Sequence, residues 1–182
     1  MPILRDLPFV RIWHAGCATG EEAYSLAILL HEEGLYDRCR IYATDINEAL
    51  LRRARGGIYS ERDVMSYAES YREGGGNGAL IDHFSIRYGH AIVHSSLRER
   101  IVFARHNLAT DRAFNDFHVI LCRNVLIYFN RELQNRAHSL LFHSLVPGGI
   151  LGLGRKESVR YTPHEQQYSL IDSGGELYRR IH

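Results

Sequence analysis

The chain has 182 residues, which suits one domain able to bury about 70% of the surface that its unfolded chain exposes. Lysine and arginine total 22 and aspartate and glutamate 21, a formal net charge of +1 that argues against a nucleic-acid-binding protein. The sequence shows no signal peptide, no apolar run of membrane length, and only three widely spaced cysteines, in neither a disulfide nor a metal-binding pattern. We therefore expect a cytoplasmic protein without a bound metal.

The first elements of the chain alternate between strands and helices. The sequence predicts a strand over 11–15, a helix over 21–33 with apolar residues recurring every three or four positions, and a second strand over 41–44. Asn47 has the side chain of an N-cap, so a further helix is expected to begin there and to end at Gly56-Gly57.

The middle of the chain is more polar and less regular. Residues 61–73 are expected to be helical, and the glycine-rich run over 74–78 predicts a flexible loop. Weak alternation over 84–100 predicts short strands in a small antiparallel insertion. At the N-terminus, residues 1–10 are expected to be a lead-in or linker.

The second half returns to strands and helices. The elements expected there are a strand over 101–104, a strand over 117–122, a helix over 131–145 that Pro147-Gly148-Gly149 ends, a strand over 150–153, and a hairpin with arms 167–171 and 176–181 joined through 172–175. The run over 117–122 is almost continuously apolar, which is typical of a central parallel strand. Strands alternating with helices indicate an α/β domain with a mostly parallel sheet, to which the hairpin adds an antiparallel edge.

The loop after the first strand indicates what kind of ligand the domain binds. Gly16 and Gly20 allow a sharp turn and a close approach to the backbone. The loop has neither the Gly-x-Gly-x-x-Gly nor the Gly-Lys-Ser/Thr pattern of a phosphate-binding loop. It places Glu21 and Glu22 in the first helical turn instead, which favours a positively charged ligand. The alternative is that both glutamates serve only the helix dipole.

Polar residues also follow the other predicted strands. Asp45 stands where an acid can accept hydrogen bonds from both hydroxyls of a ribose; alternatively, it only favours the dipole of the next helix. Asn107 and Asn124 offer a donor and an acceptor together, which suits an adenine edge or the amino-acid end of a ligand, and Leu108 would supply an apolar wall. Taken alone, either asparagine is more typical of a turn.

Five runs of sequence occur together in a distinctive order. They are residues 13–27, residues 43–46, residues 103–108, residues 121–129, and Pro147-Gly148-Gly149 with Leu153-Gly154. Together they resemble the chemotaxis-receptor methyltransferases, the CheR family, over about residues 9–180. The run Cys122-Arg123-Asn124-Val125 followed by Ile127-Tyr128-Phe129 is the most specific of the five.

The resemblance implies a class I S-adenosylmethionine-dependent methyltransferase fold, which is Rossmann-like, with a seven-stranded, mostly parallel sheet over the single domain 1–182. It also implies transfer of a methyl group from S-adenosylmethionine to glutamate side chains of a chemoreceptor or related signalling protein, giving glutamyl methyl esters and S-adenosylhomocysteine. A glutamate acceptor is ionised at neutral pH and needs no general base. The alternative is a regulatory or scaffold module that binds the cofactor without transferring its methyl group.

The resemblance also implies the site residues. The cofactor-binding set is Ala15, Gly16, Glu21, Asp45, Ile46, Asn107, Leu108, Asn124 and Val125. We choose Glu21 over Glu22 because it lies closer to the loop. Arg123 and Tyr128 would orient the acceptor carboxylate, although Tyr128 fits a packed aromatic side chain equally well.

The sequence departs from the family in three places. Full-length members carry an N-terminal helical domain that covers part of the cofactor. We therefore expect either that this chain is part of a longer one or that a separate helical domain or partner completes the site. The family's Gly-His-Ser-Glu is here Gly154-Arg155-Lys156-Glu157 followed by Ser158. The insertion over 84–100 lacks the glycine-rich loop with which some members grip a receptor's tether peptide, so no tether binding is expected.

Overall fold

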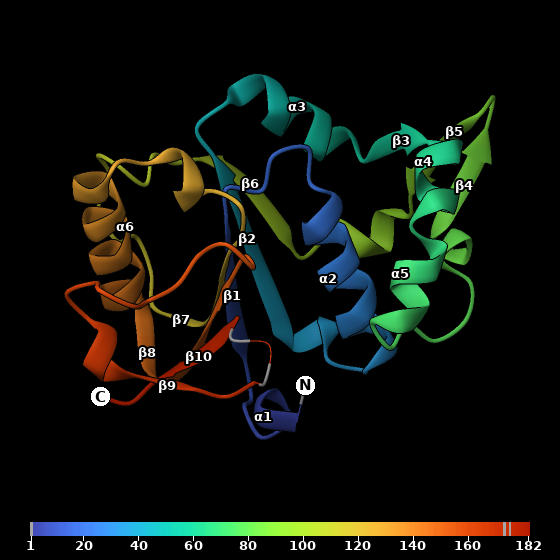
Figure 1. Cartoon of the computed structure of the whole chain (residues 1–182). Helices are drawn as coiled ribbons and strands as arrows, with labels where there is room; N and C mark the ends of the chain where they lie inside the picture. The colour runs from blue at the N-terminus through green and yellow to red at the C-terminus, as the bar shows by residue number, and fades with distance from the viewer. Residues whose placement is uncertain (1, 173, 175) are drawn as a thin grey trace.

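The computed structural model describes residues 2–172, 174 and 176–182 (Figure 1). Its centre is a seven-stranded sheet with the order β6-β2-β1-β7-β8-β10-β9. The strands are β1 (Val10–Ala15), β2 (Cys39–Asp45), β6 (Ile101–Arg105), β7 (Phe117–Cys122), β8 (Leu145–Leu153), β9 (Tyr168–Leu170) and β10 (Leu177–Arg180). The first five of these strands in chain order run parallel, whereas β10 is antiparallel to β8 and β9 is antiparallel to β10.

This topology confirms the predicted α/β class and the antiparallel edge made by the terminal hairpin. Within the connection of that hairpin, predicted over 172–175, Ser173 and Gly175 lie outside the described residues. The predicted central position of the run 117–122 is also confirmed, because β7 lies between β1 and β8.

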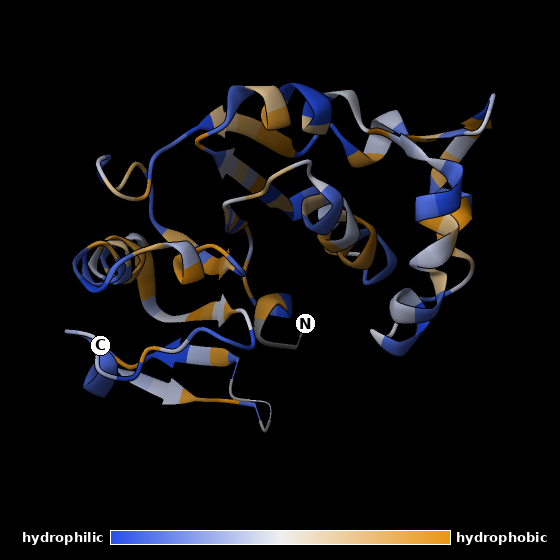
Figure 2. Cartoon of the chain, turned by 45° about the horizontal axis from the view of Figure 1, so that its top comes forward, coloured by the Kyte–Doolittle hydropathy of each residue, from blue (hydrophilic) through white to orange (hydrophobic). Residues whose placement is uncertain are grey.

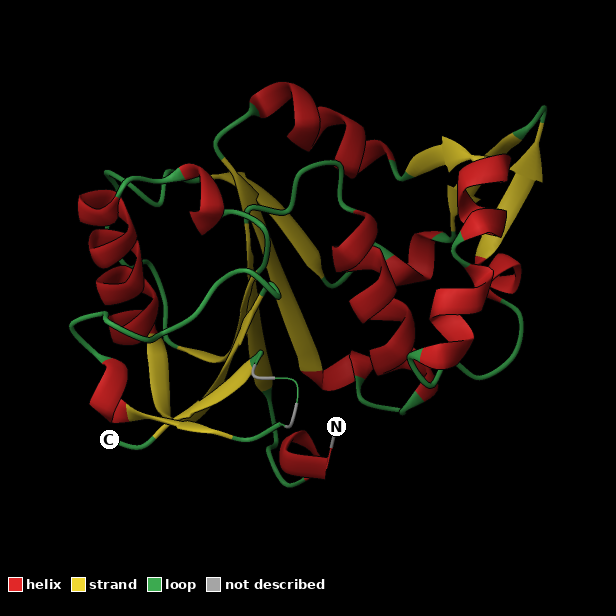
Figure 3. Ribbon diagram, in the orientation of Figure 1, coloured by secondary structure: helices red, strands yellow, loops and turns green. Residues whose placement is uncertain are grey.

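Helices cover both faces of the large sheet (Figure 3). Helices α2 (Glu21–Glu32) and α3 (Glu48–Gly56) contribute to one apolar cluster, and α6 (Arg131–Ser144) contributes to the other. Alternate side chains of β1 separate accordingly, since Ile12 belongs to the first cluster and Trp13 to the second. In Figure 2 the hydrophobic colours concentrate on the strands and on α2.

The predicted helix caps are present. Asn47 adopts an extended backbone conformation, and its side chain accepts hydrogen bonds from the Ala49 and Leu50 amides at the start of α3. Gly57 ends α3 with a left-handed φ of 59°, as glycine does at many helix ends. These local contacts explain why the boundaries of α3 could be read from the sequence.

A second, three-stranded antiparallel sheet has the order β3-β5-β4. It is built from β3 (Ile58–Ser60), β4 (Phe84–Arg87) and β5 (His90–Val93), and is accompanied by α4 (Glu61–Ser66), α5 (Ala68–Glu73) and the short 3-10 helices η2 (Leu80–His83) and η3 (Ser95–Leu97). The predicted antiparallel strands within 84–100 are thus confirmed, and so is the helical character of 61–73. The sequence analysis missed β3, which has three residues and pairs with residues 30–34 positions later in the chain.

Two predicted boundaries are wrong. Helix α6 ends at Ser144, so Pro147-Gly148-Gly149 does not end it but lies within β8. The pairing between β7 and β8 jumps from Phe117–Leu145 to Val119–Ile150, so the extra residues of β8 form an irregularity that accommodates the proline. The expected lead-in over 1–10 contains a short helix, α1 (Pro2–Arg5), and the start of β1.

The remaining short 3-10 helices are η1 (Tyr36–Arg38), η4 (Leu126–Tyr128) and η5 (Glu165–Gln167). None of the helices in the described part of the chain is long and apolar enough to cross a membrane.

Candidate cofactor and acceptor site

The loop after β1 is fastened to the carboxyl end of β2. The amides of Gly16 and Cys17 donate to the Thr44 carbonyl at 2.8 and 2.9 Å. The Ala18 amide donates to Asp45 Oδ2 at 2.9 Å, with Ala18 itself at a left-handed φ of 47°. The structure therefore brings together residues that the sequence analysis found at two separate strand ends.

Asp45 is oriented before any ligand arrives. Its Oδ1 accepts from the Asn47 amide at 2.9 Å while its Oδ2 accepts from Ala18. An ionised carboxylate has about four acceptor positions, so roughly half of its capacity is available to ribose hydroxyls. The carboxylate is half-buried, and Ile46 beside it is 54% exposed, which leaves an apolar surface next to the acid.

Gly16 faces Val125 across the edge of the sheet. Gly16 has a φ of 79°, and a Cβ built on it would lie 2.3 Å from Val125 Cγ2. Neither the backbone conformation nor the space admits a side chain here. The loops after β1 and β7 therefore touch at Gly16 and Val125, and the contact of Ala15, Gly16 and Val125 with a cofactor stays a prediction.

Glu21 and Glu22 differ in their partners. Glu22 Oε2 lies 2.9 Å from His14 Nε2, and Glu22 Oε1 accepts from Arg123 Nη1 at 2.5 Å. Burial alone would raise the pKa of Glu22, but His14 and Arg123 lower it to about 2. Glu21 accepts only from the Thr19 hydroxyl, at 2.6 and 2.7 Å, and from no cationic side chain in the described part of the chain. Glu21 is thus the acid with the greater capacity left for a cationic ligand.

The segment after β6 forms its own turn. Asn107 Oδ1 accepts from the Ala109 amide at 2.9 Å, and the Asn107 amide donates to Asp111 Oδ2 at 2.9 Å. Asn107 therefore acts as a turn residue here, and its contact with an adenine stays a prediction. Leu108 is 6% exposed and belongs to the apolar cluster under α6.

Glu157 organises the segment after β7, and the sequence analysis assigned it no role. Its carboxylate accepts hydrogen bonds from the backbone amides of Asn124, Val125, Leu126 and Gly154 at 2.7–2.9 Å. A signal was available, because Gly154-Arg155-Lys156-Glu157 keeps the first and last residues of the family's Gly-His-Ser-Glu.

The two residues expected to contact the acceptor, Arg123 and Tyr128, differ in how firmly they are held. Arg123 is fixed by its ion pair with Glu22, with 40% of its side chain exposed. Tyr128 ends η4 and is 80% exposed, so it is no packed core aromatic. Both follow β7, and both have atoms available to a bound protein.

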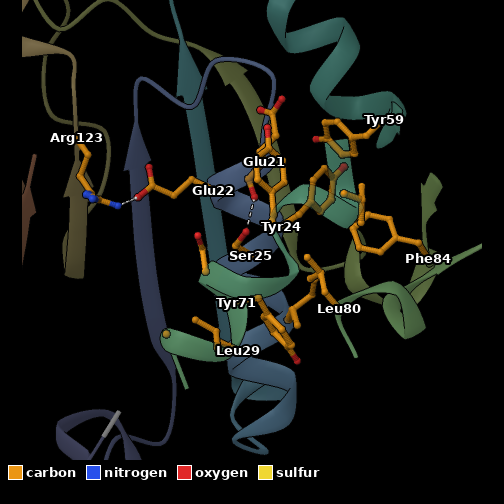
Figure 4. Close-up of a pocket in the computed structure, with 15 residues that line it drawn as sticks. Glu21, Glu22, Tyr24, Ser25, Leu29, Tyr59, Tyr71, Leu80, Phe84 and Arg123 are labelled. Atoms are coloured by element: carbon orange, nitrogen blue, oxygen red, sulfur yellow. Dashed lines mark hydrogen bonds and ion pairs between the residues drawn. The ribbon is translucent and has the colours of Figure 1, made fainter. Parts of the chain in front are cut away.

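A cavity of about 390 Å³ opens between α2 and the segment over 59–84, which contains α4 and α5. Figure 4 shows Glu21, Glu22 and Arg123 at one end of it, and Tyr24, Leu29, Tyr71, Leu80 and Phe84 among its lining side chains. Asp45 and Asn107 do not line it, so it adjoins the strand-end site rather than coinciding with it. The expected helical domain or partner would find an apolar surface here; its docking stays a prediction.

The donor set at the strand ends fits the cofactor that the resemblance implies. Glu21 can pair with a positively charged amino group or sulfonium, and Asp45 with a ribose. Gly16 and Val125 pack against each other at the same edge of the sheet. Among the described residues, no group of three histidine, cysteine, aspartate or glutamate side chains could hold a metal ion.

Comparisons with known proteins identify the family of this chain. The family model of the S-adenosylmethionine-binding domain of CheR methyltransferases matches residues 4–174. The protein Cher3 of Pseudomonas putida is 47% identical over 180 residues, which cover 99% of this chain and 66% of Cher3. A chemotaxis protein methyltransferase of Listeria innocua is 36% identical over 150 residues, which cover 82% of this chain and 54% of that protein.

Among solved structures, the DszA carbon methyltransferase aligns with a TM-score of 0.50 at 18% identity, over 84% of this chain and 30% of that one, a likeness of fold alone. This chain spans about two thirds of the length of Cher3 and about half that of the Listeria protein. The family match covers nearly the whole chain and includes every candidate site residue. The chain therefore belongs to the CheR methyltransferase family, as a domain whose cofactor is S-adenosylmethionine.

Proposed function

We propose that this domain acts in the cytoplasm and transfers the methyl group of S-adenosylmethionine to glutamate side chains of a chemoreceptor or related signalling protein. The products would be glutamyl methyl esters and S-adenosylhomocysteine. The proposed cofactor contacts are Ala15, Gly16, Glu21, Asp45, Ile46, Asn107, Leu108, Asn124 and Val125. Arg123 and Tyr128 are the proposed acceptor contacts.

The observation that carries this proposal is the separation of charge at the carboxyl edge of the sheet. Glu21 and Asp45 follow β1 and β2 and offer acceptor atoms to a cationic nucleoside. Arg123 follows β7, and Glu22 holds it in place at 2.5 Å. An acceptor glutamate, which is an anion, would find in Arg123 a cation beside the donor-binding acids.

This chain would need no general base for the reaction. When bound, S-adenosylmethionine supplies a methyl group on a positively charged sulfur. A carboxylate oxygen of the acceptor would form the new bond to the methyl carbon while the carbon–sulfur bond breaks, so no residue of this chain would have to move a proton. The residues of the site therefore have to bind, align and exclude water, and such alignment can lower a barrier by up to ~7–11 kcal/mol.

A methyl-transfer assay tests the proposal directly. The chain is incubated with S-adenosylmethionine carrying a tritiated methyl group and with the purified cytoplasmic fragment of a chemoreceptor. We expect label in the fragment that alkali releases, as it does from an ester. Tight binding of S-adenosylhomocysteine without any such label would favour the regulatory module instead.

The role of Arg123 can be separated from cofactor binding. We expect Arg123→Gln to reduce methyl transfer by at least tenfold while the affinity for S-adenosylhomocysteine changes little. Arg155→Gln is the matched control, because Arg155 also pairs with a glutamate, Glu176, at 3.3 Å but is 88% exposed. Equal activity of the two variants would contradict the assignment of Arg123.

A further inference from the structure

Glu157 is a buried carboxylate whose partners are all backbone amides. The residue is 8% exposed. Its Oε2 accepts from the amides of Gly154 at 2.8 Å and Asn124 at 2.9 Å, and its Oε1 accepts from Val125 at 2.8 Å and Leu126 at 2.7 Å. No lysine, arginine or histidine in the described part of the chain forms an ion pair with it. Among the described residues, its hydrogen-bond donors are all backbone amides, whose dipoles stabilise a carboxylate.

These hydrogen bonds determine the shape of the segment after β7. The amides of Asn124, Val125 and Leu126 are consecutive, and all three point at one carboxylate. Asn124 has a left-handed φ of 59°, a conformation that is uncommon for residues with a side chain but less so for asparagine. Glu157 binds this segment from a loop that follows a different strand, β8.

The segment that Glu157 fixes forms one wall of the proposed cofactor site. Val125 Cγ2 fills the space in front of Gly16, 2.3 Å from where a Cβ would lie. On the other side, a Cβ on Gly154 would lie 2.8 Å from Glu157 Oε2 and 2.9 Å from the Asn124 amide nitrogen. The segment is therefore confined between Gly16 and Gly154, and its distance from the first loop depends on the carboxylate.

We propose that Glu157 is a positioning residue that holds Asn124 and Val125 in their cofactor-binding conformation without contacting the cofactor itself. The inference rests on the proposed placement of the cofactor at this edge of the sheet. It assigns a function to the last residue of Gly154-Arg155-Lys156-Glu157, the tetrapeptide in which the two middle residues differ from the family pattern.

The test is the affinity of the chain for S-adenosylhomocysteine, measured by calorimetry. Glu157→Gln keeps the size of the side chain but replaces one acceptor oxygen with an amino group that faces amide donors. We expect the dissociation constant to rise at least tenfold. Glu165→Gln is the matched control, since Glu165 accepts from the Tyr161 amide at 2.7 Å in the same part of the chain but is exposed. Its affinity should stay within twofold of the parent.

Two further measurements separate positioning from a merely structural role. Glu157→Asp keeps the charge on a side chain one methylene shorter, so we expect an affinity between those of the parent and of Glu157→Gln. In the parent protein without cofactor, hydrogen exchange should show the Val125 and Leu126 amides protected at least a hundredfold relative to an unstructured peptide. This measurement requires no variant to fold.

The outcomes distinguish this inference from the proposed function. If Glu157→Gln folds and binds within twofold of the parent, or if the Val125 and Leu126 amides exchange freely in the parent, the positioning role is wrong and the cofactor site still stands. If the parent itself fails to bind S-adenosylhomocysteine at millimolar concentration, both the inference and the proposed function are overturned.

Discussion

The carboxyl edge of the large sheet and the insertion between α3 and β6 are stabilised in different ways. At the edge, Asp45 and Glu157 bind backbone amides of neighbouring loops, so each carboxylate fixes the path of the chain. The insertion has short strands, and α5 contains no buried residue. It is held against α2 by apolar side chains around the cavity and by a polar cluster at Glu32, which binds Tyr71, the Asn77 amide and His83.

This difference separates ligand binding from attachment of the insertion. Hydrogen bonds have strict geometry, so loops held by them present ligand-binding atoms in one arrangement. Apolar contacts tolerate rearrangement. One contact links the two regions, because the Tyr59 hydroxyl of β3 donates to the Thr19 carbonyl in the first loop at 2.7 Å. Substitutions at the edge should therefore change cofactor affinity, whereas those in the insertion should change stability.

The largest effect is expected at Gly16. Gly16→Ala adds a Cβ that meets Val125 at 2.3 Å and does so at a φ of 79°. We expect the affinity for S-adenosylhomocysteine to fall at least tenfold and the free energy of unfolding to fall by about 1–3 kcal/mol. Gly34→Ala is the control, because Gly34 has a φ of 67° but no atom within 4 Å of its Cβ position. If both variants bind equally, the contact between the two loops is irrelevant to binding.

The second-largest effect on cofactor affinity is expected at Asp45. Asp45→Asn removes the charge and half of the acceptor capacity, and hydrogen bonds to charged groups contribute about 1.5–3 kcal/mol. We expect calorimetry to show roughly 10–100-fold weaker binding of S-adenosylhomocysteine. Glu48→Gln removes a neighbouring acid that has a 45% exposed side chain and, among the described residues, pairs only with Arg55, so this variant should bind normally. Unchanged affinity of Asp45→Asn would remove the ribose contact from the scheme.

Much of the fold could be predicted because its signals are local. The apolar run of β7, the N-cap at Asn47 and the acid that ends β2 each depend on a few neighbouring residues. The parallel topology then follows from the alternation of strands and helices. The position of Asp45 at the carboxyl edge could be predicted for the same reason, since the acid lies at the end of a strand.

The features that were missed depend on distant pairing. The amides that Glu157 binds in the segment after β7 lie 31–33 positions earlier in the chain, so neither partner predicts the other. A proline usually marks the end of a helix. Here the chain is already a strand when it reaches Pro147, because Leu145 pairs with Phe117. Glu22 could not be distinguished from Glu21 because its partner Arg123 lies 101 residues away.

A substitution at Glu32 tests whether the insertion affects stability without affecting cofactor binding. We expect Glu32→Gln to lower the free energy of unfolding by about 1–2 kcal/mol at neutral pH and to leave cofactor affinity within twofold of the parent. Glu33→Gln is the control, because Glu33 pairs only with the exposed Arg5 in the described part of the chain. A large loss of cofactor affinity in Glu32→Gln would show that the insertion and the edge are not separate.

The pH dependence of this effect has a definite sign. Burial alone would raise the pKa of Glu32, but hydrogen bonds from Tyr71, Asn77 and His83 lower it below 4.5. A carboxyl whose pKa is lower in the folded state stabilises the fold fully above its unfolded pKa and loses that contribution as the pH falls. Urea unfolding from pH 7 downward should therefore show the parent and Glu32→Gln converging below about pH 4.5.

The smallest effect on the folded domain is expected at Tyr128, which has an 80% exposed side chain. Tyr128→Ala should change the free energy of unfolding by no more than about 0.5 kcal/mol and should leave the affinity for S-adenosylhomocysteine unchanged. If Tyr128 contacts the acceptor, KM for the receptor fragment rises several-fold while kcat changes less. Tyr161→Phe, at a 77% exposed tyrosine, should alter neither constant. An unchanged KM in Tyr128→Ala would leave Arg123 as the one proposed contact with the acceptor protein. That contact would then lie in the segment after β7, which Glu22 and Glu157 hold in place.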